Sequence, residues 1–111
     1  MNIQYRKKKL ERSVASPGAI KKYYGKRAKT VKKRLDEIHA APNLQELMNI
    51  PGPNCHPLKG EKAGQFAVNI SGNERIIFEI NHENIPKKDD GGIDLETVTA
   101  IKIISIGEDY H

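Results

Sequence analysis

The chain has 111 residues, of which 37% are hydrophobic and 30% charged, with no tryptophan and one cysteine. This length is typical of a single domain with one hydrophobic core. One cysteine excludes an intrachain disulfide and a metal site built from several cysteines. No run of about 18 apolar residues occurs, and no apolar stretch follows the basic N-terminal residues. We therefore expect a cytosolic chain with neither a membrane-spanning helix nor a secretory signal.

The charge is divided unevenly along the chain. Residues 1–41 hold 13 Lys and Arg against 3 Asp and Glu, whereas residues 42–111 hold 6 against 11. Concentrated positive charge favours a polyanionic partner, because Lys and Arg displace counterions from phosphates. A solvated basic helix face gives the same pattern, so charge alone leaves both interpretations open.

The first elements are short. Residues 2–5 alternate weakly and suggest an edge strand, and residues 7–14 suggest one or two helical turns. Ser16 followed by Pro17 is a helix start signal, because serine caps a first turn and proline fits the first helical position.

A stronger helical signal follows. Apolar residues recur every three or four positions and predict one long amphipathic helix over about 17–41, with lysines on its polar face. Pro42 should end this helix, because the residue before a proline avoids helical geometry. Asn43 should then cap a short helical turn over 44–48.

In the second half the hydrophobic period changes from about 3.6 to 2. Residues 65–70 and 75–80 alternate around the turn signal of residues 71–73 and predict a β-hairpin. A polar segment at about 81–96 predicts a mobile loop. Residues 98–106 are nearly all apolar or β-branched and predict a last strand near the centre of a sheet.

These elements predict an α+β fold of two layers in one domain over residues 1–111. The N-terminal helices should pack on one face of an antiparallel sheet formed by about residues 54–111. The other face of the sheet would then remain free, and a functional site is expected there.

Three short segments concentrate side chains that can transfer protons or bind phosphate. They are His56 and Lys59 in HPLKG, Arg75 in GNERIIF, and Asp109, Tyr110 and His111 in the terminal GEDYH. Each has an ordinary explanation: a surface histidine, a charged turn, an arginine paired with Glu79 or Glu83, a frayed end. Together they supply a base, an acid and cations, which are the groups needed to cleave a phosphodiester without a metal.

The chain closely resembles the HigB branch of the RelE/ParE toxin superfamily, the plasmid maintenance killer proteins. The resemblance lies in the runs YGKRAKTVKKRLDEIHAAPNLQELMNIPG and HPLKGEKAGQFAVNISGNERIIFEI and in the terminal DYH, over about residues 18–80 and 98–111. It implies a RelE-like fold, a toxin that cleaves mRNA on the ribosome, and neutralisation by a HigA-type antitoxin. It also implies a reaction without cofactor or metal.

The resemblance implies a catalytic surface as well. In the family this surface is built from the HPLKG histidine and lysine, the strand arginine and the terminal Asp-Tyr-His, here His56, Lys59, Arg75, Asp109, Tyr110 and His111. The chain departs from the family at Glu74, where an aromatic residue is common. A second departure is the loop over 81–97, which is longer than usual.

Roles can be assigned only in part. His111 is the expected acid for the leaving 5′-oxygen, because imidazole changes protonation near neutral pH and the neighbouring carboxylate favours its charged form. Asp109 or His56 should act as the base for the attacking 2′-hydroxyl or orient that base. The other candidates would hold the substrate. Lys59 and Arg75 would bind the scissile phosphate, and Tyr110 would stack on a nucleobase or hydrogen-bond a phosphate. The products would be a 2′,3′-cyclic phosphate and a 5′-hydroxyl.

The polar face of the predicted long helix is expected to dock on ribosomal RNA with little sequence readout. Its candidate residues are Lys22, Lys26, Lys29, Lys32 and Lys33.

Three alternatives remain open. A ParE-type inhibitor that poisons gyrase would share the fold and have no need of Lys59, Arg75 and His111. An RNA-binding accessory domain would tolerate substitution of the same three residues. A metal nuclease using His56, His82 and His111 is least favoured, because a loop and two separate strands give no helical ligand spacing.

Overall fold

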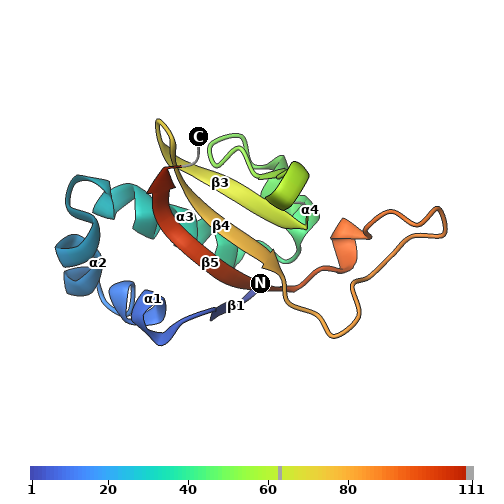
Figure 1. The fold of residues 1–111 in the computed structure, drawn as a ribbon, viewed down its shortest axis with the longest axis horizontal. Coiled ribbons are helices and arrows are strands. Elements are labelled where there is room, and N and C mark those ends of the chain that lie inside the picture. Colours follow the sequence, from blue (N-terminus) through green and yellow to red (C-terminus); the bar gives the residue numbers. More distant parts are fainter. Residues whose placement is uncertain (63, 110–111) are drawn as a thin grey trace.

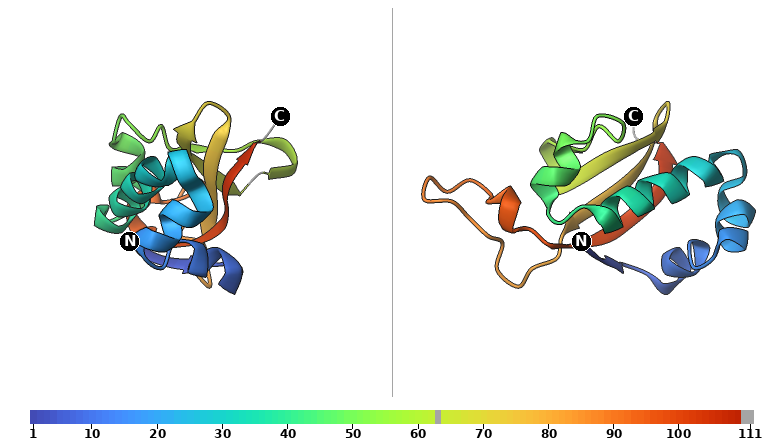
Figure 2. Two further views of the ribbon diagram at one scale, coloured as in Figure 1. Left: turned by 90° about the vertical axis from the view of Figure 1, so that its left-hand side faces the viewer. Right: turned by 180° about the vertical axis from the view of Figure 1, so that it is seen from behind.

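The computed structural model describes residues 1–62 and 64–109, with the backbone alone at residues 108 and 109. One layer is helical and the other is a sheet (Figure 1), which has five strands in the described residues. In the left view of Figure 2 the helices lie on one side of the sheet. The predicted α+β fold of two layers is confirmed.

The helical layer has four α-helices and a 3₁₀ turn in the described chain. They are α1 (Lys8–Ser13), α2 (Pro17–Tyr24), η1 (Gly25–Arg27), α3 (Ala28–Ala40) and α4 (Leu44–Asn49). Both predicted caps form: Ser16 Oγ accepts from the Ala19 amide at 3.1 Å, and Asn43 Oδ1 accepts from the Glu46 amide at 2.9 Å. The two start signals in the sequence therefore coincide with the N-termini of α2 and α4.

The prediction of one helix over 17–41 is wrong, because the chain breaks at Gly25. This residue has φ 50° and ψ −115°, a left-handed φ that favours glycine, and η1 follows it. In the right view of Figure 2, α3 runs along the sheet while α2 turns away from it. The apolar period continues on both sides of the break, which is why the pattern alone predicted a continuous helix.

The strands of the sheet are β1 (Asn2–Tyr5), β2 (His56–Pro57), β3 (Gln65–Ser71), β4 (Glu74–Ile80) and β5 (Ala100–Asp109). Their order is β1-β5-β4-β3-β2, so β4 is central and β5 lies beside it. The sheet is mixed and not antiparallel as expected, because β1 pairs with β5 in parallel. The reason is topological: the helical layer carries the chain across the sheet from β1 at one edge to β2 at the other.

The core lies between the helices and one face of the sheet. Val68, Ile76 and Phe78 are fully buried there together with Val31 and Ile38 of α3. Because side chains alternate along a strand, Arg75 and Ile77 must point to the opposite face. The predicted hairpin of β3 and β4 is confirmed with this register.

Residues 81–99 form an extension at one end of the molecule (Figure 1). It contains a bridge between Lys87 and Ile93, a bond from the Lys88 amide to the Gly92 carbonyl at 2.7 Å, and the 3₁₀ turn η3 (Leu95–Thr97). The extension thus has local structure, and its mobility stays a prediction. No helix in the described part of the chain has the length and apolar character needed to cross a bilayer.

Candidate functional site

The strand register brings His56 and Arg75 to the same face of the sheet. His56 lies opposite Ala67, and Ala67 lies opposite Ile77, so the three side chains share the face away from the helices. Arg75 precedes Ile77 by two residues and joins them. With strands about 4.8 Å apart and a rise of about 3.4 Å per residue, the Cα atoms of His56 and Arg75 are roughly 12 Å apart.

Arg75 has no ion pair or hydrogen-bond partner for its guanidinium among the described side chains. Its Nε is buried and has no hydrogen-bond partner in the described structure. Within the residues whose side chains are described, Arg75 forms no ion pair with Glu79 or Glu83, which was the ordinary explanation for it. An unsatisfied buried N–H of a charged group is costly, and an anionic ligand would satisfy it.

His56 is half-buried on the edge strand β2, and its ring is fixed by the backbone. Its Nδ1 lies 2.7 Å from the carbonyl oxygen of Asn54. Asn54 has φ 49°, the only positive φ of a non-glycine residue in the described chain. The face of the sheet away from the α-helices (Figure 2), called the open face below, therefore carries an imidazole that can exchange a proton and a guanidinium that can bind an anion.

Lys59 is exposed and lies in the connection between β2 and β3, which includes the 3₁₀ turn η2 (Gly60–Lys62). The Leu58 amide donates to the carbonyl of Gln65 at 2.8 Å, so this segment adjoins the first residue of β3. Arg75 lies opposite Asn69, about 13 Å further along β3. The contact of Lys59 and Arg75 with one phosphate therefore depends on the reach of their long side chains and stays a prediction.

The last strand ends beside Arg75. The Cα register pairs Arg75 with Glu108 and Glu74 with Asp109, so the backbone of Asp109 is next to the predicted site. Tyr110, His111 and the side chain of Asp109 lie outside the described residues. Their predicted roles therefore stay predictions.

Glu74, the departure from the family pattern, has a clear partner. Its Oε1 accepts from Arg27 Nε at 2.7 Å and links β4 to η1 on the helix side of the sheet. Sequence reasoning did not identify this pair, nor did it identify Arg34 or Asn54. For Arg34 the available signal is an arginine within a run of lysines, and for Asn54 it is the preceding Pro-Gly-Pro turn.

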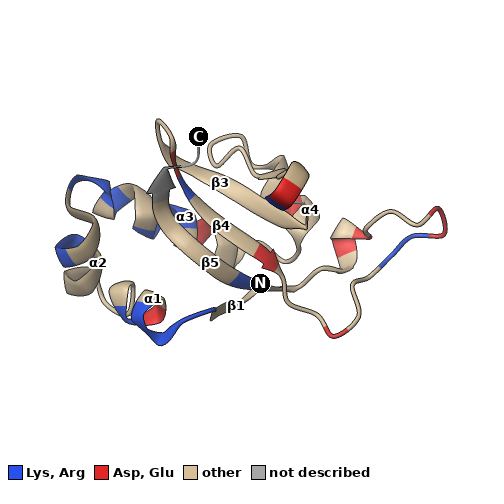
Figure 3. Cartoon of the chain, in the orientation of Figure 1, with Lys and Arg blue, Asp and Glu red and all other residues tan. Residues whose placement is uncertain are grey.

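Lys and Arg gather on α1, α2, η1 and the start of α3, whereas the extension of residues 81–99 carries much of the acidic charge (Figure 3). Among the predicted docking residues, Lys32 pairs with Asp36 at 2.8 Å and Lys22 lies 5.8 Å from the centre of the Tyr23 ring. Lys26, Lys29 and Lys33 are exposed and form no ion pair within the described structure.

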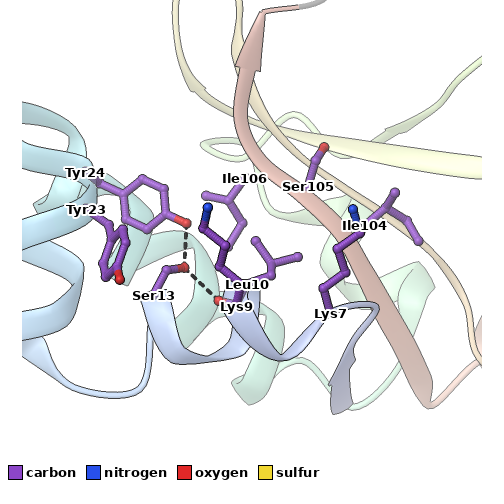
Figure 4. Close-up of a pocket in the computed structure, with 9 residues that line it drawn as sticks. All are labelled: Lys7, Lys9, Leu10, Ser13, Tyr23, Tyr24, Ile104, Ser105 and Ile106. Carbon is purple, nitrogen blue, oxygen red and sulfur yellow. Dashed lines mark hydrogen bonds between the residues drawn. The ribbon is translucent and has the colours of Figure 1, made fainter.

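A cavity of about 240 Å³ lies between α1, α2 and β5 (Figure 4). Lys7, Lys9 and Tyr23 line it, and Ser13 at its wall donates to the Leu10 carbonyl and bonds the Tyr24 hydroxyl, both at 2.6 Å. Burial raises the pKa of Tyr24. The predicted catalytic residues whose side chains are described, His56, Lys59 and Arg75, do not line this cavity.

His82 and Cys55, two further residues whose side chains could bind a metal or act as a nucleophile, are engaged in the fold. His82 Nε2 accepts from the Thr99 amide at 3.1 Å. Cys55 is buried, and burial raises the pKa of its thiol to about 12, so the reactive thiolate is suppressed. No group of three His, Cys, Asp or Glu side chains in the described part of the chain is arranged to hold a metal.

Three solved structures share this fold. The YoeB/ParE toxin from Agrobacterium tumefaciens has a TM-score of 0.58 at 11% identity and covers 99% of this chain and 100% of its own. The YoeB–YefM complex and the YoeB dimer, both from Staphylococcus aureus, have TM-scores of 0.55 and 0.52 at 16% and 17% identity. Each of these two matches covers 99% of this chain and 98% of the other.

Comparison with protein-family models gives no match, and neither does comparison with curated proteins. At these identities the likeness concerns the fold, and it extends over nearly the whole chain. The chain has the fold of YoeB and ParE toxins.

Proposed function

We propose that this chain is the toxin of a type II toxin–antitoxin system and a metal-independent endoribonuclease that cleaves mRNA on the ribosome. The motif resemblance to HigB and the fold shared with YoeB and ParE toxins support a toxin. The observation that carries the nuclease proposal is Arg75 on the open sheet face, whose guanidinium forms no ion pair with any described side chain and whose buried Nε has no described hydrogen-bond partner. Such a cation suits the charge that develops on a phosphorane.

The proposed reaction is attack of a 2′-hydroxyl on the adjacent phosphate. The O2′–P bond forms, the P–O5′ bond breaks, and the products are a 2′,3′-cyclic phosphate and a 5′-hydroxyl. The base takes the 2′ proton and the acid gives a proton to O5′. In this proposal Arg75 and Lys59 bind the phosphate. His56 or Asp109 is the general base and His111 the general acid. Tyr110 contacts a nucleobase or a phosphate.

The same proposal assigns the exposed lysines to ribosomal RNA. Lys26, Lys29 and Lys33 are free of ion pairs in the described structure and lie on the basic half of the chain. Charge reversal at these three residues should weaken ribosome affinity and flatten its salt dependence, because fewer counterions are released. Single-turnover cleavage on saturated ribosomes should stay unchanged, which separates docking from chemistry.

We further propose an antitoxin of the HigA type as the partner, encoded beside the toxin and acting with it in the cytoplasm. The resemblance to HigB supports this partner, and one of the similar toxins was solved as a YoeB–YefM complex. Growth arrest on expression of the chain, relieved by co-expression of the neighbouring gene, is the expected result.

The test of the nuclease is substitution of Arg75. Single-turnover cleavage of ribosome-bound mRNA should fall by about 10²–10³-fold in Arg75→Ala, the usual cost of removing a group that stabilises transition-state charge. Arg75→Lys should recover only part of the loss, because a point charge cannot make two parallel hydrogen bonds. The matched control is Arg12→Ala, which removes an exposed arginine of α1.

Cleavage within threefold of wild type in Arg75→Ala would contradict the assignment. Growth arrest by the wild-type chain with no new 5′-hydroxyl ends on mRNA would instead favour the gyrase-inhibiting alternative.

A further inference from the structure

The hydrogen bond of His56 determines which nitrogen of its neutral ring lacks a proton. A backbone carbonyl can only accept, so the 2.7 Å contact with the Asn54 oxygen requires a proton on Nδ1 of His56. In the neutral imidazole the other nitrogen, Nε2, then carries a lone pair and no proton. This is the form that a general base needs, and it is the less common tautomer of a neutral imidazole in water.

The carbonyl is held in place by a local conformation that few residues adopt. Asn54 has φ 49°, and asparagine tolerates this left-handed region better than other residues with a Cβ atom. The residue before it, Pro53, is fully buried, and its carbonyl accepts from the Asn69 amide of β3 at 2.8 Å. The turn is thus anchored to the sheet immediately before Asn54 directs its own carbonyl at the ring.

His56 also lies where a base is useful. It is on the open face, opposite the fully buried Ala67, and it shares that face with Arg75, which forms no ion pair with the described side chains, at a Cα separation of roughly 12 Å. An imidazole and a long guanidinium at this spacing can approach one nucleotide from two sides. The register therefore places His56 and Arg75 on one face of the sheet, two strands apart.

We propose that Nε2 of His56 is the general base that takes the 2′-hydroxyl proton, and that Asn54 is its positioning residue. This assignment rests on the proposed ribonuclease function and decides between His56 and Asp109. The proton moves from the 2′-hydroxyl to Nε2, O2′ bonds to phosphorus, and O5′ leaves with a proton from the acid. Throughout, the Asn54 carbonyl keeps Nδ1 protonated and stabilises the imidazolium that forms.

The tautomer can be measured without any assay of activity. Two-bond ¹H–¹⁵N correlations of the histidine rings, recorded where the imidazole is neutral, should show His56 protonated at Nδ1. Asn54→Gly should keep this tautomer, because glycine adopts the left-handed region freely, whereas Asn54→Val should lose it. His39 of α3 is exposed and serves as the internal reference for a ring in water.

Cleavage supplies the second readout. His56→Gln should lower single-turnover cleavage by about 10²–10⁴-fold, the usual contribution of a general base. Asn54→Val should lower it by roughly tenfold or more through misplacement of the ring, while Asn54→Gly and the control His39→Gln stay near wild type. If Asn54→Val fails to fold, the tautomer of His56 in the wild type and in Asn54→Gly still tests the assignment of Nε2 as the base.

A wild-type His56 protonated at Nε2 would overturn the base assignment and leave the nuclease proposal standing. Cleavage within threefold of wild type in His56→Gln would do the same and favour Asp109. Absence of cleavage by the wild-type chain would overturn the nuclease proposal, and the base assignment with it.

Discussion

Arg34 of α3 holds together the elements that support the open face. Its Nε donates to the Asn69 carbonyl at 2.7 Å, its Nη2 to the Gly52 carbonyl at 3.3 Å, and its Nη1 pairs with Glu37 at 2.8 Å. Only 11% of the side chain is exposed. These bonds join the helix to β3 and to the turn that precedes His56.

The cost of removing Arg34 follows from these contacts. Arg34→Ala loses three hydrogen bonds from a charged donor and leaves the Glu37 carboxylate, which is 19% exposed, without its partner. Removing one member of a fully buried ion pair costs about 3–5 kcal/mol. Because the Arg34–Glu37 pair is partly exposed, we expect the lower end, a loss of about 3 kcal/mol in the free energy of unfolding. Arg34→Lys should cost about half as much, because it keeps the charge but not the fork.

The measurement is urea unfolding followed by circular dichroism. The same helix offers a matched control, Lys32→Ala, which removes an ion pair of equal length, 2.8 Å, whose side chains are 53% and 62% exposed. That variant should lose only about 0.3–0.5 kcal/mol. A loss below about 1 kcal/mol in Arg34→Ala, or one equal to the control, would refute the reasoning.

Two further predictions concern titrating groups. Because burial raises the pKa of Cys55 to about 12, Ellman's reagent should react slowly with the native thiol and at the normal rate in urea; equal rates would show that the thiol is accessible. Burial also raises the pKa values of Tyr5 and Tyr24 above their ordinary value of 10.0, so the unfolded chain loses these protons first. Stability should therefore be complete below pH 10 and decline above it, and Tyr24→Phe should show a smaller decline in urea unfolding at alkaline pH; an unchanged decline would contradict the assignment.

Local signals in the sequence predicted the fold where local chemistry decides it. Ser16 and Asn43 cap helices because each oxygen accepts from an amide only three residues away. The alternation of residues 75–80 permits Arg75 to face away from the helices, because a strand exposes successive side chains to opposite faces, and the structure has Ile76 and Phe78 in the core.

Long-range contacts decide the rest, and the sequence does not display them. The parallel pairing of β1 with β5 joins residues about a hundred positions apart, and an amphipathic period cannot show it. The break at Gly25 is local, but the pattern does not show it either, since a glycine inside a periodic stretch is also compatible with a helix. The fixed ring of His56 needs both a left-handed Asn54 and a turn anchored to β3, neither of which a motif encodes.

Glu74 shows why a departure from a family pattern has to be judged by the face on which it lies. The position precedes Arg75, so the sequence alone suggests that an aromatic residue there would stack on an RNA base. The strand alternation puts position 74 on the helix side, where the carboxylate pairs with Arg27 of η1. A side chain on that side cannot stack on a substrate held by Arg75, because the sheet itself lies between them. Glu74 therefore helps to hold β4 against the helical layer and does not lie on the open face.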